Sequence, residues 1–207
     1  MRHRHIHRAP GARIAGRLAI VGGLAAGCFV TQVGRADGAL GPDGNSGTLG
    51  ASAPDLRTRY AGSYRYAGSA AEQKARADAI DRSVGTFFFA VRGIARAKVA
   101  DRTRIMPTCK FDFSGGNIRS TVPGHAVAVS PETGAPAAYR VDDDAVVLSQ
   151  RFDGQRLVQM FRADEGGTRT NEFMLSPDGA LLTMKATLSS PKLSVPVVYT
   201  LTYRRAE

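Results

Sequence analysis

From about residue 108 to its end, this chain is a series of short strand-like runs with no helix-length segment between them. Apolar and polar side chains alternate along residues 180–189, so that Leu182, Met184 and Leu188 share one face of a strand. Turn residues such as Asp153-Gly154 separate the runs. Strands that follow one another this closely must pair antiparallel. The pattern predicts an antiparallel meander with one face on a core and the other in water.

The expected fold class is mainly β, with about 8–10 strands. Residues 108–122 should form two strands around Gly115-Gly116, and Tyr199 and Tyr203 should share the inner face of the last strand. The other expected strands cover residues 60–69, 145–152, 155–162, 168–175, 180–189 and 195–203, with weaker ones near Val127 and Tyr139. A sheet of this length must curl, and closure into a barrel removes its exposed edges. An open half-barrel is the alternative.

One amphipathic helix is expected after the first strand, within residues 69–101. Ser69 and Glu72 have the spacing of a capping box at its start. Gly85 is unfavourable inside a helix, so we expect the helix to break near it. An arc of about 120° should form the apolar face, which contains Ile80, Val84, Phe87, Phe88, Val91, Ile94 and Ala95.

The N-terminal 36 residues have the features of a signal peptide. A basic segment precedes an apolar run from Leu18 to Val30, which is too short to span a bilayer, since spanning needs roughly 20 apolar residues. Gly34 and Ala36 fit cleavage after Ala36, and lipidation of Cys28 is the alternative. Residues 37–54 are rich in Gly, Ser and Pro and read as a flexible linker, which leaves 55–207 as one domain. We expect an exported protein, periplasmic or extracellular, with peripheral or no membrane contact.

Charge and cysteine content exclude several classes of function. The formal net charge is +10, but without the first 36 residues 22 basic and 18 acidic residues leave only +4. No basic run interleaved with aromatic residues remains, so we expect no nucleic-acid partner. Cys109 would be the one cysteine left after cleavage, which excludes an internal disulfide and favours a small buried side chain.

No constellation in the sequence predicts a metal, a cofactor or a catalytic centre. His3, His5 and His7 lie in the segment that export would remove, and His125 stands alone in a turn-like loop. The acidic run 142–144 lacks the alternating ligand pattern of a calcium loop. We therefore predict no cofactor and no metal, and no motif of a known enzyme class appears.

The order strand, helix and uninterrupted meander resembles the calycin superfamily of lipocalins and fatty-acid-binding proteins. In lipocalins a Gly-x-Trp motif packs against an Arg near the last strand, and Gly62-Ser63-Tyr64 and Arg204 stand at those places. The resemblance implies a barrel with an apolar interior, in which Tyr64 and Arg204 are the barrel-closing residues.

The leading hypothesis is an exported, non-catalytic, monomeric barrel that binds a small hydrophobic molecule. The residues expected to line or cover its pocket are Phe87, Phe88, Val91, Leu182, Met184, Leu188, Tyr199 and Tyr203. Two alternatives stay open, namely a structural envelope module with a filled core and a barrel enzyme of the isomerase type. Two carboxylates, or a Tyr–Asp pair, facing one pocket would favour the enzyme.

Overall fold

A computed structural model describes residues 55–141 and 144–206 of the chain. In chain order they form α1 (Leu56–Tyr60), β1 (Gly62–Tyr66), α2 (Ala70–Val84), α3 (Phe89–Arg102), β2 (Thr108–Ser114), β3 (Asn117–Thr121), β4 (Ala128–Pro131), β5 (Ala137–Val141), β6 (Asp144–Asp153), β7 (Arg156–Ala163), β8 (Thr168–Leu175), β9 (Leu181–Ser189) and β10 (Val197–Arg205). The expected signal peptide, linker and residues Asp142 and Asp143 lie outside the described residues.

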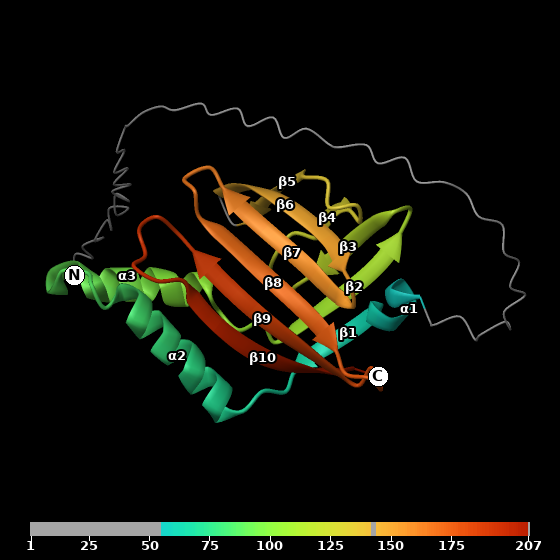
Figure 1. Cartoon of the computed structure of the whole chain (residues 1–207), viewed down its shortest axis with the longest axis horizontal. Coiled ribbons are helices and arrows are strands. Elements are labelled where there is room, and N and C mark those ends of the chain that lie inside the picture. Colours follow the sequence, from blue (N-terminus) through green and yellow to red (C-terminus); the bar gives the residue numbers. More distant parts are fainter. Residues whose placement is uncertain (1–54, 142–143, 207) are drawn as a thin grey trace, which may run out of the picture. The chain divides into compact units, whose positions relative to one another are not determined.

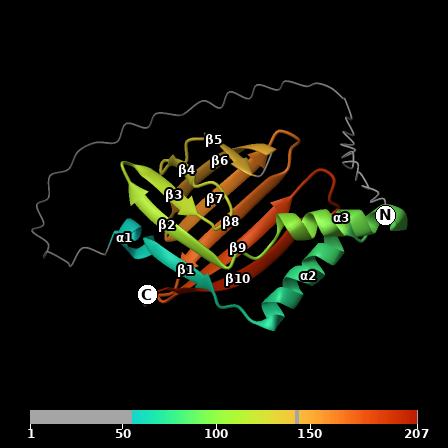
Figure 2. The same cartoon turned by 180° about the vertical axis from the view of Figure 1, so that it is seen from behind.

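The ten strands form one antiparallel sheet in the order β4-β3-β2-β1-β10-β9-β8-β7-β6-β5. Every neighbouring pair consists of consecutive strands except β1 with β10, which joins the two ends of the meander, and α2 and α3 lie in the connection between β1 and β2. The sheet curls into a nearly closed barrel, visible from both sides in Figures 1 and 2. The expected mainly β meander with helices after the first strand is therefore confirmed.

Side-chain hydrogen bonds join the two edge regions of the barrel, where β4 and β5 are not paired with each other. The Gln150 amide on β6 donates to the Ile118 carbonyl on β3 at 3.0 Å and to the Ser130 hydroxyl on β4 at 3.3 Å. A single bridge pairs Thr133 with Arg151. Side-chain hydrogen bonds and this isolated bridge thus close the barrel where the regular strand pairing stops.

Strand alternation was predicted correctly where one face is buried. On β9, Leu182, Met184 and Ala186 are buried while Thr183 and Lys185 are exposed. The predicted Gly115-Gly116 turn joins β2 to β3, and both glycines have the positive φ angles, 56° and 73°, that this hairpin turn requires. A residue with a side chain would be strained at either position.

The first strand is shorter than predicted, because Tyr60 belongs to α1 instead. The Asp55 side chain accepts a hydrogen bond from the Arg57 amide and starts this short helix. The Tyr60 hydroxyl donates to the carbonyls of Gln155, at 2.6 Å, and Phe173, at 3.0 Å. These tertiary bonds hold Tyr60 against the barrel, and sequence periodicity carries no sign of them.

The predicted break near Gly85 is confirmed, and it divides the helical segment into α2 and α3. Ser69 caps α2 as expected, since its hydroxyl accepts from the Glu72 amide. The Glu72 carboxylate does not complete a capping box but accepts from the backbone amide and hydroxyl of Thr202 on β10, at 3.0 and 2.7 Å. Glu72 therefore ties α2 to the barrel wall.

The continuous apolar helix face was predicted wrongly beyond the break. Ile80 and Val84 of α2 are buried, but Phe88, Val91 and Ile94 are exposed. The turn between the helices changes the axis direction, so the arc drawn for one straight helix does not continue along α3. Figures 1 and 2 show α2 and α3 at one end of the barrel and α1 at the other.

Candidate functional site

A cavity of about 850 Å³ lies in the barrel and opens beside α3. Its inner wall is mostly apolar and is formed by side chains of β2, β8, β9 and β10, namely Cys109, Phe111, Phe173, Met184 and Tyr203. All five are buried. The volume falls within the roughly 300–1,000 Å³ typical of small-molecule sites.

Aromatic packing fixes the bottom of the cavity. The rings of Phe111 and Phe173 meet edge to face, with centroids 5.0 Å apart and planes at 73°. Phe111 in turn packs against Tyr64, with ring centroids 6.1 Å apart. Such edge-to-face pairs add to the stability that burial alone provides. We expect this part of the cavity to keep its shape whether or not a guest is present.

Three buried amides form a row in the barrel wall, and two of them, Gln159 and Asn171, line the cavity. Gln150, Gln159 and Asn171, called the amide row below, are direct cross-strand neighbours on β6, β7 and β8. The Gln159 amide nitrogen donates to Gln150 Oε1 at 3.0 Å, and the Asn171 nitrogen donates to Gln159 Oε1 at 2.9 Å. Gln159 also donates to the Ser120 hydroxyl at 2.7 Å. Because the amides satisfy one another, they can be buried at little cost.

Sequence reasoning missed the amide row, although a signal for it exists. On β6 and β7 an inward position between two apolar inward residues carries an amide, as Gln159 does between Leu157 and Phe161. On β8 the amide of Asn171 stands between Arg169 and Phe173. Three such amides at matching register indicate a polar layer inside an apolar barrel. That register is known only once the strands have been paired.

The charged residues of the cavity lining lie at its opening. Lys98, Arg102, Arg104, Asp144, Asp164, Glu165 and Lys192 are all exposed, and Arg169 is half-buried. Arg102 is paired with Asp144, and Lys192 with Glu165. The described carboxylates that line the cavity therefore stand at its rim, and none of them faces the amide row or the aromatic floor.

Arg169 connects the rim with the amide row. Its Nε donates to Asn171 Oδ1 at 3.0 Å, and its Nη1 donates to the Arg102 carbonyl, at the end of α3, at 2.7 Å. These two bonds hold the guanidinium at the boundary between the charged opening and the neutral interior.

Burial changes the acid–base behaviour of the inner wall. It raises the pKa of the Cys109 thiol to about 12, because the thiolate would lose its hydration. The same cause raises the pKa of the Tyr203 hydroxyl above its ordinary value. Both groups are therefore neutral at physiological pH, and Cys109 is a small buried side chain, as its surroundings in the sequence suggested.

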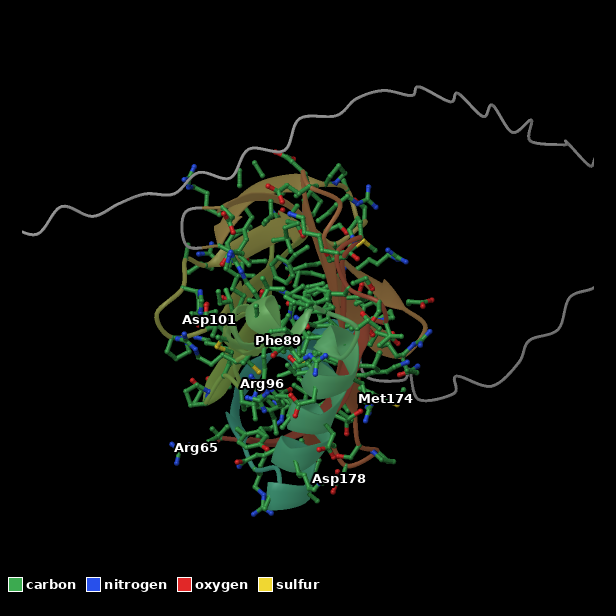
Figure 3. All side chains as sticks on the ribbon, turned by 90° about the vertical axis from the view of Figure 1, so that its left-hand side faces the viewer. Arg65, Phe89, Arg96, Asp101, Met174 and Asp178 are labelled. Atoms are coloured by element: carbon green, nitrogen blue, oxygen red, sulfur yellow. The ribbon has the colours of Figure 1, made fainter. Side chains whose placement is uncertain are left out.

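The structure brings four of the eight proposed pocket residues to the cavity wall, namely Phe87, Met184, Leu188 and Tyr203. Leu182 and Tyr199 are buried in the core but do not line the cavity. Phe88 is 67% exposed and Val91 50% exposed, so neither closes the cavity as a lid. Figure 3 shows the adjacent Phe89 on the helix pair in front of the barrel, and Phe89 is 76% exposed.

The barrel-closing pair consists of Tyr64 and Arg205, one position from the Arg204 that was predicted. Arg204 is exposed, whereas the Arg205 guanidinium lies 5.0 Å from the centre of the Tyr64 ring and donates to its hydroxyl at 2.8 Å. Arg205 also donates to the carbonyls of Ala61 and Gly179, at 2.6 and 3.1 Å. Alternation along β10 continues to Arg205, which lies on the same face as Tyr203, whereas Arg204 lies on the exposed face.

His125 lies in the loop between β3 and β4, as expected, where it is half-buried and lines the cavity. No three His, Cys, Asp or Glu side chains within residues 55–141 and 144–206 come together in a way that could hold a metal ion. In the same residues, no helix has the length and apolar character needed to cross a bilayer.

No protein-family model matches the chain, and no curated protein matches its sequence. Solved structures with a similar fold include a secretory abundant heat soluble protein of Ramazzottius varieornatus, at 8% identity and a TM-score of 0.49 over 72% of this chain and 96% of that one. Lipid binding protein 8 of Caenorhabditis elegans has 10% identity and a TM-score of 0.46, covering 72% and 96%.

A fatty acid binding protein of Schistosoma mansoni, solved with arachidonic acid, has 15% identity and a TM-score of 0.45, covering 74% of this chain and all of its own. The chain itself forms a nearly closed antiparallel barrel with a helix pair after its first strand.

Proposed function

We propose that this protein is an exported, non-catalytic binding protein that holds one small hydrophobic molecule in its barrel. The observation that carries the proposal is the cavity of about 850 Å³ with an aromatic and aliphatic inner wall. A filled core, as in the structural-module alternative, would leave no such space. An apolar guest would regain dispersion contacts for the wall and remove its own surface from water, at roughly 25 cal/mol per Å².

The same wall argues for binding over catalysis. Its buried polar groups are amides, hydroxyls and a thiol, and the amides are engaged with one another. The lining carboxylates Asp144, Asp164 and Glu165 are exposed at the rim. An isomerase would be favoured by two carboxylates, or by a Tyr–Asp pair, facing one pocket. The carboxylates that line this cavity lie at its rim instead, so its lining supports binding.

A cavity-filling substitution tests the proposal. Leu188→Trp would place an indole in the cavity, while Val198→Trp would add the same ring to the outer face of the neighbouring strand, where Val198 is exposed. We expect the purified protein to bind a neutral environment-sensitive probe, N-phenyl-1-naphthylamine, in a saturable and competable way. Leu188→Trp should weaken this binding about tenfold or more, and Val198→Trp should leave it unchanged.

Two further measurements complete the test. Phe88→Asp should change neither probe binding nor melting temperature, since Phe88 does not line the cavity. Native mass spectrometry of protein purified from its own host should show an added mass if a guest is retained. A well-folded wild-type protein without saturable probe binding and without added mass would contradict the proposal and favour the structural module.

A further inference from the structure

The amide row is not satisfied evenly along its length. A primary amide offers two N–H donors and an oxygen with two lone pairs. Gln150 uses all four, since its nitrogen donates to the Ile118 carbonyl and the Ser130 hydroxyl. Its oxygen accepts from the Ser120 hydroxyl and from the Gln159 nitrogen. This fully bonded member of the row does not line the cavity.

The two amides that do line the cavity have hydrogen-bonding capacity left. Gln159 donates both of its N–H groups, to Ser120 and Gln150. Among the described residues, its oxygen accepts only from Asn171. Asn171 donates once, to Gln159, and accepts once, from Arg169. Within the part of the chain that the structure describes, one N–H and one lone pair of Asn171 and one lone pair of Gln159 therefore have no protein partner.

These spare donors and acceptors lie deep in the barrel, since Gln159 and Asn171 are each only 5% exposed. A guest that expels water from the cavity without replacing its hydrogen bonds leaves buried polar groups unpaired, which is costly for each of them. A hydrocarbon would pair with none of the three. A carboxylate, which can only accept, would lose its hydration and face the two amide oxygens with a single N–H available to it.

We infer that the guest is an uncharged molecule with one group that both donates and accepts hydrogen bonds, an amide or a hydroxyl, held by Asn171 and Gln159 inside the barrel. The inference rests on the proposed function and specifies its ligand class. The free Asn171 N–H donates to the oxygen of this group, and the group donates its own hydrogen to Gln159 Oε1 or Asn171 Oδ1. The apolar remainder of the guest packs on the wall formed by Phe111, Phe173 and Met184.

The experiment compares four ligands that share a large carbon ring and differ in their polar group. Cyclododecane has no polar group, and cyclododecanone can only accept a hydrogen bond. Laurolactam both donates and accepts, and cyclododecanecarboxylate is charged. Each competes with N-phenyl-1-naphthylamine for the purified protein. Because cyclododecane makes no hydrogen bond, its affinity reports whether the cavity is intact in each variant.

Three variants separate recognition by Asn171 from its structural role in the row. Asn171→Leu replaces the amide by an apolar side chain of similar size. Asn171→Asp keeps an acceptor for the Arg169 bond but has no N–H to donate in its ionised form. Gln150→Met is the matched control, because it breaks the same amide row at a residue that does not line the cavity.

We expect Asn171→Leu to weaken laurolactam binding about tenfold, the range of one buried neutral hydrogen bond, and to change cyclododecane binding less than about twofold. Asn171→Asp should weaken cyclododecanone by about as much, because the ketone oxygen loses its donor, and this variant decides the question if Asn171→Leu does not fold. Gln150→Met should change laurolactam and cyclododecane by the same factor. The wild type should bind the carboxylate at least about tenfold more weakly than laurolactam.

Three outcomes would overturn the inference while the proposed function stands, because cyclododecane still displaces the probe. The Asn171 variants weaken polar ligands and cyclododecane alike; Gln150→Met weakens laurolactam as selectively as Asn171→Leu does; or the wild type binds the carboxylate more tightly than laurolactam. If none of the four ligands displaces the probe, or the probe itself does not bind with saturation, the proposed function fails together with the inference.

Discussion

Truncation of Leu182 to alanine should lower the free energy of unfolding by about 3–4 kcal/mol. Leu182 has no exposed surface and packs on β9 between its cross-strand neighbours Tyr203 and Leu175. The substitution removes three carbons, worth about 0.8 kcal/mol each in lost burial, or about 2.4 kcal/mol. Because Leu182 does not line the ligand cavity, the vacated space is a new, closed void, which adds the remainder.

The same truncation at Leu188 should cost only about 1 kcal/mol. Leu188 lies on the same face of the same strand but is half-buried and already lines the cavity. Its removal enlarges an existing space instead of creating a closed void. Thr183→Ala, on the exposed face of β9, is the control and should stay within about 0.5 kcal/mol of the wild type.

Urea titrations followed by far-UV circular dichroism measure all three differences, provided the slope of the transition is the same for each variant. Equal losses of unfolding free energy in Leu182→Ala and Leu188→Ala would refute the reasoning, since they would mean that the cavity beside Leu188 is filled in solution. A large loss of unfolding free energy in Thr183→Ala would instead show that the inner face of β9 had been assigned to the wrong residues.

Arg205→Ala should destabilise the protein by about 3 kcal/mol, because it removes charge-assisted hydrogen bonds to two chain segments, whereas exposed Arg204→Ala should be near neutral in the same titration. The Cys109 thiol, whose pKa burial raises to about 12, should react with Ellman's reagent at pH 8 at least about tenfold more slowly in the native protein than in urea. Equal rates would show that the thiol is accessible and ionisable in the fold. Intact-mass measurement of the exported protein should give an N-terminus directly after Ala36, and a lipidated Cys28 there would contradict this expectation.

Local sequence features determined the strands and turns of this protein. Alternation on β9 assigned Leu182 and Met184 to the core, and Gly115-Gly116 marked a hairpin, because both signals arise from one strand or one turn. They operate over a few residues and need no knowledge of the partner strand. The helix break at Gly85 could be predicted for the same reason.

Residues whose roles depend on two distant segments could not be assigned in this way. The amide row exists because Gln150, Gln159 and Asn171 fall into register on three strands, and register is a property of the pairing. Alternation within β10 places Arg204 on the exposed face, but only the pairing of β1 with β10 sets Arg205 opposite Tyr64. In each case the deciding contact joins parts of the chain that are far apart in sequence.

The sequence by itself determined that the chain forms an antiparallel meander with one helical segment, broken near Gly85, after the first strand, because hydrophobic period and turn chemistry act locally. Only the tertiary structure decided that the barrel holds a cavity, and that Phe87 lines it while Phe88 faces solvent. The physical reason is that a void depends on how side chains from distant strands pack. The change of helix axis at the turn between α2 and α3 is enough to turn Phe88, which was expected on the inner face, toward solvent.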